Sequence, residues 1–199
     1  AAQFAANVKE EDKAILTAWM GLPDNHYPTE EEDWEGSLVL PRELKIVNDK
    51  LYQLPVPQIL ELRQEKVEPT GYLPRVAEVQ VKHTGGNAQL TLFSKPDGTG
   101  GLQLSYDAAR KTVTINRSQM ELRFNQEIGE VLEVPLENDL TDITLYLDRS
   151  SVEIFFNKGE ATFTTHLYPT EQEDSYEASP NLDLEIWMLR SSVTDDFVV

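Results

Sequence analysis

The strongest constraint on the fold is a two-residue alternation of apolar and polar side chains in short segments, without any long helical periodicity. Ile143, Leu145 and Leu147 fall on one face of such a segment, and the residues between them fall on the other. Side chains of a strand point alternately to opposite faces, so this pattern predicts antiparallel strands joined by turns. Three consecutive strands are predicted here, at residues 142–148, 152–156 and 161–167.

Similar alternating segments recur on both sides of this meander, separated by turns rich in Gly, Asn and Asp. They cover residues 76–83, 88–94, 102–106, 111–116 and 182–190. Short strands at this spacing are typical of a sandwich or a barrel. We therefore expect an all-β fold in which an antiparallel β-sandwich occupies residues 67–199.

The first 55 residues have a different character. Strand-like segments at 13–20 and 37–40 flank an irregular stretch that contains prolines and the acidic run 30–33. This part is too small and too interrupted for a core of its own, so we expect residues 1–55 to belong to a larger domain. Residues 56–66 are expected to be a linker. Apolar residues at helical spacing over 58–66 predict a short helix within it.

Composition excludes several classes of function. Asp and Glu number 35 against 17 Lys and Arg, which gives a net charge of −18. Binding to nucleic acid or to an anionic membrane depends on clustered cations, so neither partner is expected. The longest apolar runs are far shorter than the roughly 20 residues of a membrane-spanning helix. The chain has no cysteine, which excludes disulfides and thiolate metal sites.

The titratable residues show no pattern that predicts catalysis within this chain. Asp148 and Glu153 are the tempting pair, because glycosidases use two carboxyl groups at a defined separation. With so many acidic residues, chance proximity is expected, and a structural role is favoured for both. His26, His83 and His166 are too widely separated for a metal-binding motif. We therefore expect no catalytic residue, no metal site and no cofactor here.

Two stretches contain aromatic residues, prolines and turn residues in arrangements that packing of a hydrophobic core does not require. The first contains Trp19-Met20-Gly21-Leu22-Pro23-Asp24, Tyr27-Pro28-Thr29, Trp34-Glu35-Gly36-Ser37-Leu38 and Leu40-Pro41-Arg42-Glu43-Leu44, and the second contains Leu147-Asp148-Arg149-Ser150-Ser151-Val152-Glu153-Ile154-Phe155 with Tyr168-Pro169. Both resemble the C-terminal half of glycoside hydrolase family 32, the β-fructosidases that include invertases. The first is most similar to the form found in bacterial sucrose-6-phosphate hydrolases.

The resemblance implies a domain arrangement and a partner. Members of the family have a five-bladed β-propeller that carries the active site, followed by a β-sandwich. Residues 1–55 would then be the remnant of the last propeller blade, 56–66 the linker and 67–199 the sandwich. The implied partner is the missing N-terminal propeller portion of the same polypeptide, with sugar bound only in the intact enzyme. The resemblance also implies a cytoplasmic location, and the sequence leaves a homo-oligomer open.

The family's catalytic motifs do not occur in this sequence. The resemblance implies a nucleophile in Asn-Asp-Pro-Asn-Gly, a stabilising Asp in Arg-Asp-Pro and an acid/base Glu in Glu-Cys, and the chain contains neither an Asp-Pro dipeptide nor a cysteine. We therefore expect the 199 residues alone to be inactive. Trp19 is the one site residue that carries over, as an aromatic lining the fructose pocket. A tryptophan packed between blades is an equally weighted alternative. Arg42 is expected to be an ion-pair partner for a nearby acid.

Two other functional classes remain open from the sequence. A free-standing carbohydrate-binding sandwich would present coplanar aromatic side chains on one exposed sheet face, and Tyr106, Tyr146 and Phe155 are the available candidates. A structural or dimerisation domain would self-associate without affinity for sugar.

Overall fold

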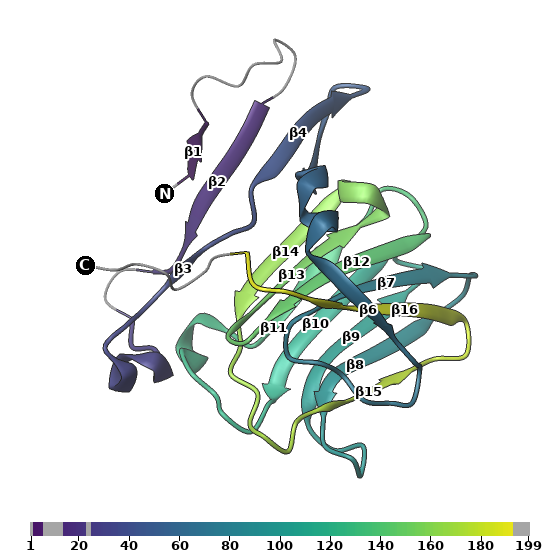
Figure 1. Cartoon of the computed structure of the whole chain (residues 1–199). Helices are drawn as coiled ribbons and strands as arrows, with labels where there is room; N and C mark the ends of the chain where they lie inside the picture. The colour runs from purple at the N-terminus through teal and green to yellow at the C-terminus, as the bar shows by residue number, and fades with distance from the viewer. Residues whose placement is uncertain (1, 6–13, 23–24, 193–199) are drawn as a thin grey trace.

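The computed structural model describes residues 2–5, 14–22 and 25–192, and it contains three β-sheets (Figure 1). Every strand pairing among the described residues is antiparallel. The prediction of an all-β fold with an antiparallel sandwich is confirmed. In Figure 1 the first sheet, drawn in purple and blue, stands beside the two sheets of the sandwich.

The described residues up to 55 form a small sheet with the strand order β1-β2-β4-β5, in which β3 pairs with β2. We call this part the N-terminal unit. Its elements are β1 (Ala2–Phe4), β2 (Ala14–Met20), the 3₁₀ helix η1 (Pro28–Glu32), β3 (Ser37–Leu38), β4 (Arg42–Val47) and β5 (Lys50–Pro55). The β2–β3 pairing sets Trp19 opposite Leu38 and Met20 opposite Ser37, so the Trp-Met-Gly motif lies at the end of a strand.

The helix in the segment that follows ends earlier than the sequence predicts. A 3₁₀ helix, η2 (Pro57–Leu62), is followed directly by strand β6 (Arg63–Val67). The expected helix over 58–66 is therefore wrong from residue 63 onward. Strand β6 pairs with β16, which places Val67 opposite Ile186 and Lys66 opposite Trp187. Pairing with a distant strand here outweighs the local helical spacing, as tertiary context often does.

The sandwich consists of a five-stranded and a six-stranded sheet. The five-stranded order is β11-β10-β9-β8-β15, and the six-stranded order is β14-β13-β12-β7-β16-β6. The strands are β7 (Ala77–His83), β8 (Ala88–Ser94), β9 (Gly101–Asp107), β10 (Thr112–Gln119), β11 (Val131–Pro135), β12 (Asp142–Asp148), β13 (Ser151–Phe156), β14 (Ala161–His166), β15 (Ser175–Ala178) and β16 (Leu182–Leu189), with 3₁₀ helices η3 (Gln126–Ile128) and η4 (Asn157–Gly159) between them.

One hydrophobic core lies between these two sheets. Ile143, Leu145 and Leu147 of β12 all belong to it, as their alternation predicts. Val152, Ile154 and Phe156 of β13 join them, while the other residues of β13 point to the outer face of the sheet. Alternation in the meander therefore assigns the core correctly.

The outer face of the six-stranded sheet carries a cross-strand row of polar and aromatic side chains. Strand register places one member on each strand: Thr164, Glu153, Tyr146, Glu78, Trp187 and Lys66. Glu153 and Glu78 are buried, at 4% and 0% exposed. The N-terminal unit covers this outer face at β13 and β14, where Leu40 and Arg42 contact Glu153 and Thr164. The outer face is therefore buried there by an interface between the two parts of the chain.

Candidate functional site

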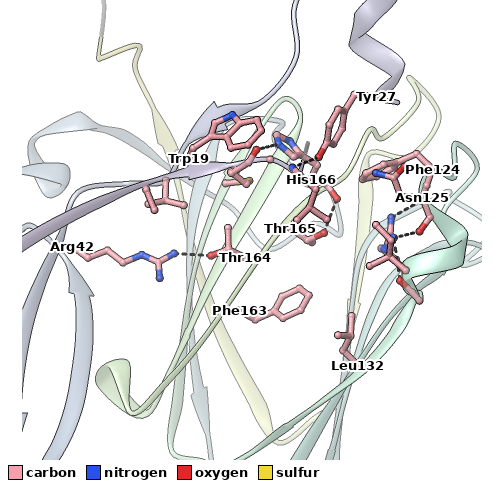
Figure 2. A pocket seen from close by; sticks show the side chains of 18 of the residues that line it. Trp19, Tyr27, Arg42, Phe124, Asn125, Leu132, Phe163, Thr164, Thr165 and His166 are labelled. Carbon is pink, nitrogen blue, oxygen red and sulfur yellow. Dashed lines mark hydrogen bonds between the residues drawn. The ribbon is translucent and has the colours of Figure 1, made fainter. Parts of the chain in front are cut away.

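The main candidate site is a cavity of about 440 Å³ between the N-terminal unit and the sandwich (Figure 2). Strand β2 forms one wall, β14 forms the second, and the loop around η3 forms the third. In Figure 2, Trp19 and His166 lie at one end of the cavity, and Phe163 and Leu132 lie at the other. An apolar cavity with a few polar groups is the usual form of a ligand site.

Trp19 is the exposed aromatic side chain of this site. Trp19 is 37% exposed. Its indole lies against the backbone of two glycines, Gly21 and Gly36. A Cβ atom on Gly21 would lie 2.3 Å from Cζ2 of Trp19, and one on Gly36 would lie 2.4 Å from Nε1. Any larger residue at these two positions would push the indole away, and Gly36 also has a φ of +71°, which favours glycine. The two glycines thus make the seat on which the indole lies.

His166 connects the sandwich to the strand that carries Trp19. It is 5% exposed and is the last residue of β14. Its Nε2 lies 2.7 Å from the carbonyl oxygen of Met20, and its Nδ1 lies 2.9 Å from the carbonyl oxygen of Ser150. Carbonyl oxygens only accept hydrogen bonds, so the donor in each contact is a ring nitrogen that carries a proton, and a neutral imidazole, with one N–H, donates to one of the two carbonyls.

Four aromatic rings form a closed cluster around this bridge. Tyr27 comes from the N-terminal unit, and His166, Tyr168 and Phe124 come from the sandwich. Ring centroids lie 5.4 Å apart for Tyr27 and His166, 6.0 Å for His166 and Tyr168, 5.1 Å for Tyr168 and Phe124, and 5.9 Å for Phe124 and Tyr27. The Tyr27 hydroxyl also accepts a hydrogen bond of 2.9 Å from the backbone of Leu22. The cluster therefore holds the two peptides on either side of Gly21, through the Met20 carbonyl and the Leu22 N–H.

A buried ion pair joins the two parts of the molecule beside the cavity. Nη2 of Arg42 donates to Oε2 of Glu153 at 2.6 Å and to Oγ1 of Thr164 at 2.6 Å. The other oxygen of Glu153 accepts the Leu40 N–H at 2.7 Å. Burial raises the pKa of the Glu153 carboxyl, while these two donors oppose the rise. The expectation that Arg42 pairs with an acid is confirmed, and its guanidinium also lies 5.1 Å from the ring centroid of Phe155.

The third wall of the cavity is ordered by Arg117. Its guanidinium donates to the carbonyl oxygens of Phe124, Asn125 and Gly129 at 3.0, 3.2 and 3.1 Å. The same group lies 4.6 Å from the ring centroid of Phe124. Burial lowers the pKa of the Arg117 guanidinium. These three hydrogen bonds all go to backbone carbonyl oxygens, so Arg117 stabilises the conformation of the loop that forms this wall.

Asp148 and Glu153, the pair considered from the sequence, are each engaged in structural hydrogen bonds. Both oxygens of Glu153 are occupied by Arg42 and Leu40, and Asp148 accepts the N–H of Arg149 at a turn. Within the described ranges, no group of His, Asp and Glu side chains could hold a metal ion. None of the helices in that part of the chain has the length and hydropathy that a bilayer crossing requires.

The alternative of an aromatic sugar platform on the sandwich is wrong for its three candidates. Tyr106, Tyr146 and Phe155 are 5%, 8% and 0% exposed. Tyr146 and Phe155 meet edge to face, at an interplanar angle of 83°, so they form no flat surface. Burial raises the pKa of Tyr146, with the neighbouring Glu78 adding to the effect. Tyr106 belongs to the core between the two sheets, and Phe155 lies under the guanidinium of Arg42 from the N-terminal unit.

Sequence reasoning did not identify the role of His166. The spacing of the histidines excludes His166 from a metal-binding motif and indicates no other role for it. A signal was present in β14, where polar Thr162, Thr164 and His166 alternate on the face away from the core. All three lie within hydrogen-bonding distance of groups in the N-terminal unit, two at Arg42 and one at Met20. The polar alternation of β14 was thus visible in the sequence, but its partners in the N-terminal unit were not.

Two protein-family models match the chain in consecutive order. The model described as "Glycosyl hydrolases family 32 N-terminal domain" matches residues 1–55, and "Glycosyl hydrolases family 32 C terminal" matches residues 59–187. The second match alone covers more than half of the chain.

Curated relatives agree with these models. A sucrose-6-phosphate hydrolase of Streptococcus mutans is 32% identical over 165 residues, covering 81% of this chain and 34% of the relative. A raffinose invertase of Escherichia coli is 34% identical over 180 residues, covering 85% of this chain and 37% of the relative. The chain therefore spans about a third of the length of the curated relatives that it matches.

Solved structures show the same fold. The sucrose-6-phosphate hydrolase of Lactobacillus gasseri matches with a TM-score of 0.81 at 25% identity, over 90% of this chain and 39% of that one. A β-fructofuranosidase of Bombyx mori matches with a TM-score of 0.77 at 24% identity, over 98% of this chain and 41% of that one. These likenesses agree with the expected arrangement, a β-sandwich preceded by the remnant of a propeller blade. On the strength of both family models, the chain belongs to glycosyl hydrolase family 32.

Proposed function

We propose that these 199 residues are the non-catalytic C-terminal portion of a retaining β-fructosidase that hydrolyses sucrose or sucrose 6-phosphate. The observation that carries the proposal is the exposed Trp19 indole, seated on Gly21 and Gly36 at the end of a strand in the part that matches the family's N-terminal domain. A flat indole contacts a sugar ring through its apolar face without requiring charge. The remaining polypeptide would supply the catalytic carboxylates.

In this proposal the sandwich has a structural role. Residues 1–55 are the end of the propeller domain, 56–66 the linker, whose last four residues are already part of the edge strand β6 of the six-stranded sheet, and 67–199 the sandwich. The buried Arg42–Glu153 pair and the His166–Met20 hydrogen bond support the proposal, because they fasten the Trp19 strand to the sandwich. The choice between sucrose and sucrose 6-phosphate, the cytoplasmic location and a homo-oligomer stay predictions.

The first test measures release of glucose or glucose 6-phosphate from sucrose and sucrose 6-phosphate by the purified 199-residue chain. We expect no release, because the chain has neither an Asp-Pro dipeptide nor a cysteine for the family's catalytic motifs. Release that survives repurification and follows the protein concentration would contradict the non-catalytic assignment.

A chimera tests the positive part of the proposal. The upstream two thirds of the Streptococcus mutans relative, joined to residue 1, would supply the missing propeller portion, and we expect the chimera to hydrolyse one of the two sugars. Trp19→Ala in the chimera should raise KM, because it removes a sugar contact. Trp34→Ala is the matched control, since Trp34 is also exposed, at 40%, and is expected to leave KM unchanged. An unchanged KM in Trp19→Ala would exclude Trp19 as a sugar contact.

A further inference from the structure

The Met20–Gly21 peptide is the point at which the sandwich can influence Trp19. The carbonyl of this peptide, from Met20, lies 2.7 Å from Nε2 of His166. Its other residue, Gly21, forms part of the seat of the Trp19 indole, where a single added Cβ would collide with the ring. Movement of this one peptide would therefore change the position of the indole.

His166 is itself held in a fixed orientation. Its second nitrogen lies 2.9 Å from the carbonyl oxygen of Ser150, in the turn between β12 and β13. Its ring stacks on Tyr168 with an interplanar angle of 7° and meets Tyr27 edge to face at 64°. A side chain that is 5% exposed, with a carbonyl oxygen at each ring nitrogen and an aromatic ring on two sides, cannot readily change rotamer. Two of these constraints, the Ser150 carbonyl and the Tyr168 ring, come from the sandwich.

We infer that His166 is a positioning residue, through which the sandwich sets the orientation of the Trp19 indole by holding the Met20 carbonyl. The functional importance of this role rests on the proposed function, in which the Trp19 indole contacts the sugar. The role gives the sandwich a part in the orientation of an aromatic side chain that belongs to the N-terminal unit. The orientation of Trp19 can be measured without any sugar, so the inference is testable by itself.

The test uses Trp19 as its own reporter. The chain has three tryptophans, so Trp34→Phe and Trp187→Phe leave Trp19 as the only tryptophan, and excitation selective for indole over tyrosine then reports on Trp19. In this background, His166→Phe keeps an aromatic ring against Tyr168 but removes both ring nitrogens and with them the contact to the Met20 carbonyl. We expect a roughly twofold rise in the acrylamide quenching constant of Trp19 and a shift of its emission maximum, because the released peptide frees the indole. His166→Gln, which keeps an amide donor, should lie close to the parent.

His83 provides a matched control. It is also the last residue of its strand, its Nδ1 lies 2.8 Å from the carbonyl oxygen of Leu140, and its ring meets Tyr106 edge to face at 5.4 Å. It does not line the cavity that contains Trp19. His83→Phe should therefore disturb the fold to a similar degree and leave the quenching of Trp19 unchanged. Gly21→Ala is the positive control, because its Cβ displaces the indole directly.

Each outcome decides for or against the inference. A change in His166→Phe that is absent from His83→Phe and reversed in His166→Gln supports it. Equal changes in the two phenylalanine variants, no change in either, or a glutamine variant that behaves like phenylalanine would overturn it. If His166→Phe does not fold, the comparison of His166→Asn with His166→Gln replaces it, since the shorter amide should not reach the Met20 carbonyl.

The chimera separates this inference from the proposed function. If Trp19→Ala leaves KM unchanged while His166→Phe still alters the quenching of Trp19, the sugar contact is wrong and the positioning is right. If Trp19→Ala raises KM while His166→Phe alters neither KM nor quenching, the sugar contact stands and the positioning role is excluded. When both are right, His166→Phe should raise KM with a smaller effect on kcat.

Discussion

On the inner face of the six-stranded sheet, Leu145 and Ile154 pack against the opposite sheet of the sandwich, whereas on the outer face Glu78 and Glu153 meet arginines. All four residues are buried, at 0–4% exposed. Burial on the inner face depends on volume and shape, and such contacts tolerate many apolar sequences. Burial on the outer face depends on the direction and distance of hydrogen bonds, because a carboxylate in a low-dielectric site needs its donors at hydrogen-bonding distance.

The two faces therefore stabilise different things. Apolar contacts hold the two sheets of the sandwich together, while the ionic and hydrogen-bonded contacts fix where the N-terminal unit and β6 lie on the sandwich. Arg63 makes two hydrogen bonds with Glu78, at 2.7 and 2.6 Å, and Arg42 joins Glu153 at 2.6 Å. Bidentate and charge-assisted bonds of this kind add geometric specificity. We expect the inner face to dominate stability and the outer face to dominate the placement of Trp19.

The largest expected effect breaks the inner face. Phe156→Ala should lower the free energy of unfolding by about 4 kcal/mol, because it removes a fully buried ring and leaves a cavity. Urea denaturation followed by circular dichroism measures the loss. Leu122→Ala is the control, since Leu122 is 39% exposed and its loss should be small. Equal losses in the two variants would contradict the assignment of the core.

The second effect breaks the outer face. Glu153→Gln removes the counter-charge of a buried arginine and should cost about 3 kcal/mol, because an uncompensated buried charge remains. The double variant Arg42→Met/Glu153→Leu replaces the pair by apolar groups of similar size. Urea denaturation should find it more stable than Glu153→Gln alone. A double variant that loses more than the sum of the losses of Arg42→Met and Glu153→Leu, or as much as that sum, would show that the two residues are not coupled as a pair.

A smaller effect appears as the pH falls. Burial alone would raise the pKa of the Glu160 carboxyl, but hydrogen bonds from Asn138 and Asn157 hold it below its ordinary value. A carboxyl whose pKa is lower in the folded than in the unfolded chain stabilises the fold above the unfolded pKa, near 4.3. That stabilisation is lost as the pH falls through the folded pKa. Urea midpoints of the parent and of Glu160→Gln, recorded from pH 7 to pH 3, should therefore converge as the pH decreases, and parallel curves would contradict this role.

The smallest effect concerns an ion pair that belongs to neither face. Arg110 and Glu133 form two hydrogen bonds, at 3.0 and 2.9 Å, on the exposed surface of the five-stranded sheet. Solvent and salt screen such a pair. Arg110→Ala should leave the urea midpoint unchanged within error. A loss as large as that of Glu153→Gln would show that burial is not what separates the two ion pairs.

Local patterns predicted the inner face and not the outer one. Ile143, Leu145 and Leu147 identify the core by alternation alone, because period and burial follow from strand geometry. Glu153 and Tyr146 also alternate correctly, yet a polar residue on the second face of a strand is normally exposed to water. Whether it meets water or another unit depends on residues far away in the sequence, here Arg42. The sequence of one strand contains no information about that partner.

The candidate site was predicted in part for the same reason. Trp19 was identified through a resemblance rather than from its neighbours, and its role stays a prediction. The glycines at 21 and 36 were visible as part of the motif, but their function as a seat for the indole required coordinates. His166 acts across the two units, over contacts that no local spacing records. Long-range hydrogen bonds are thus the part of the site that single-sequence reasoning does not predict.

The position of β16 has a consequence for the order in which the protein is made. Strand β16 lies between β7 and β6, so β6, which ends at Val67, has no neighbour until residues from Leu182 onward are synthesised. At a translation rate of about 5–20 residues per second, that wait lasts roughly 6–23 s. During this interval the edge of β7 is unpaired and open to mispairing or to chaperones. A ribosome that stops before residue 182 releases a chain that lacks an internal strand of its six-stranded sheet, although only the end of the sequence is missing.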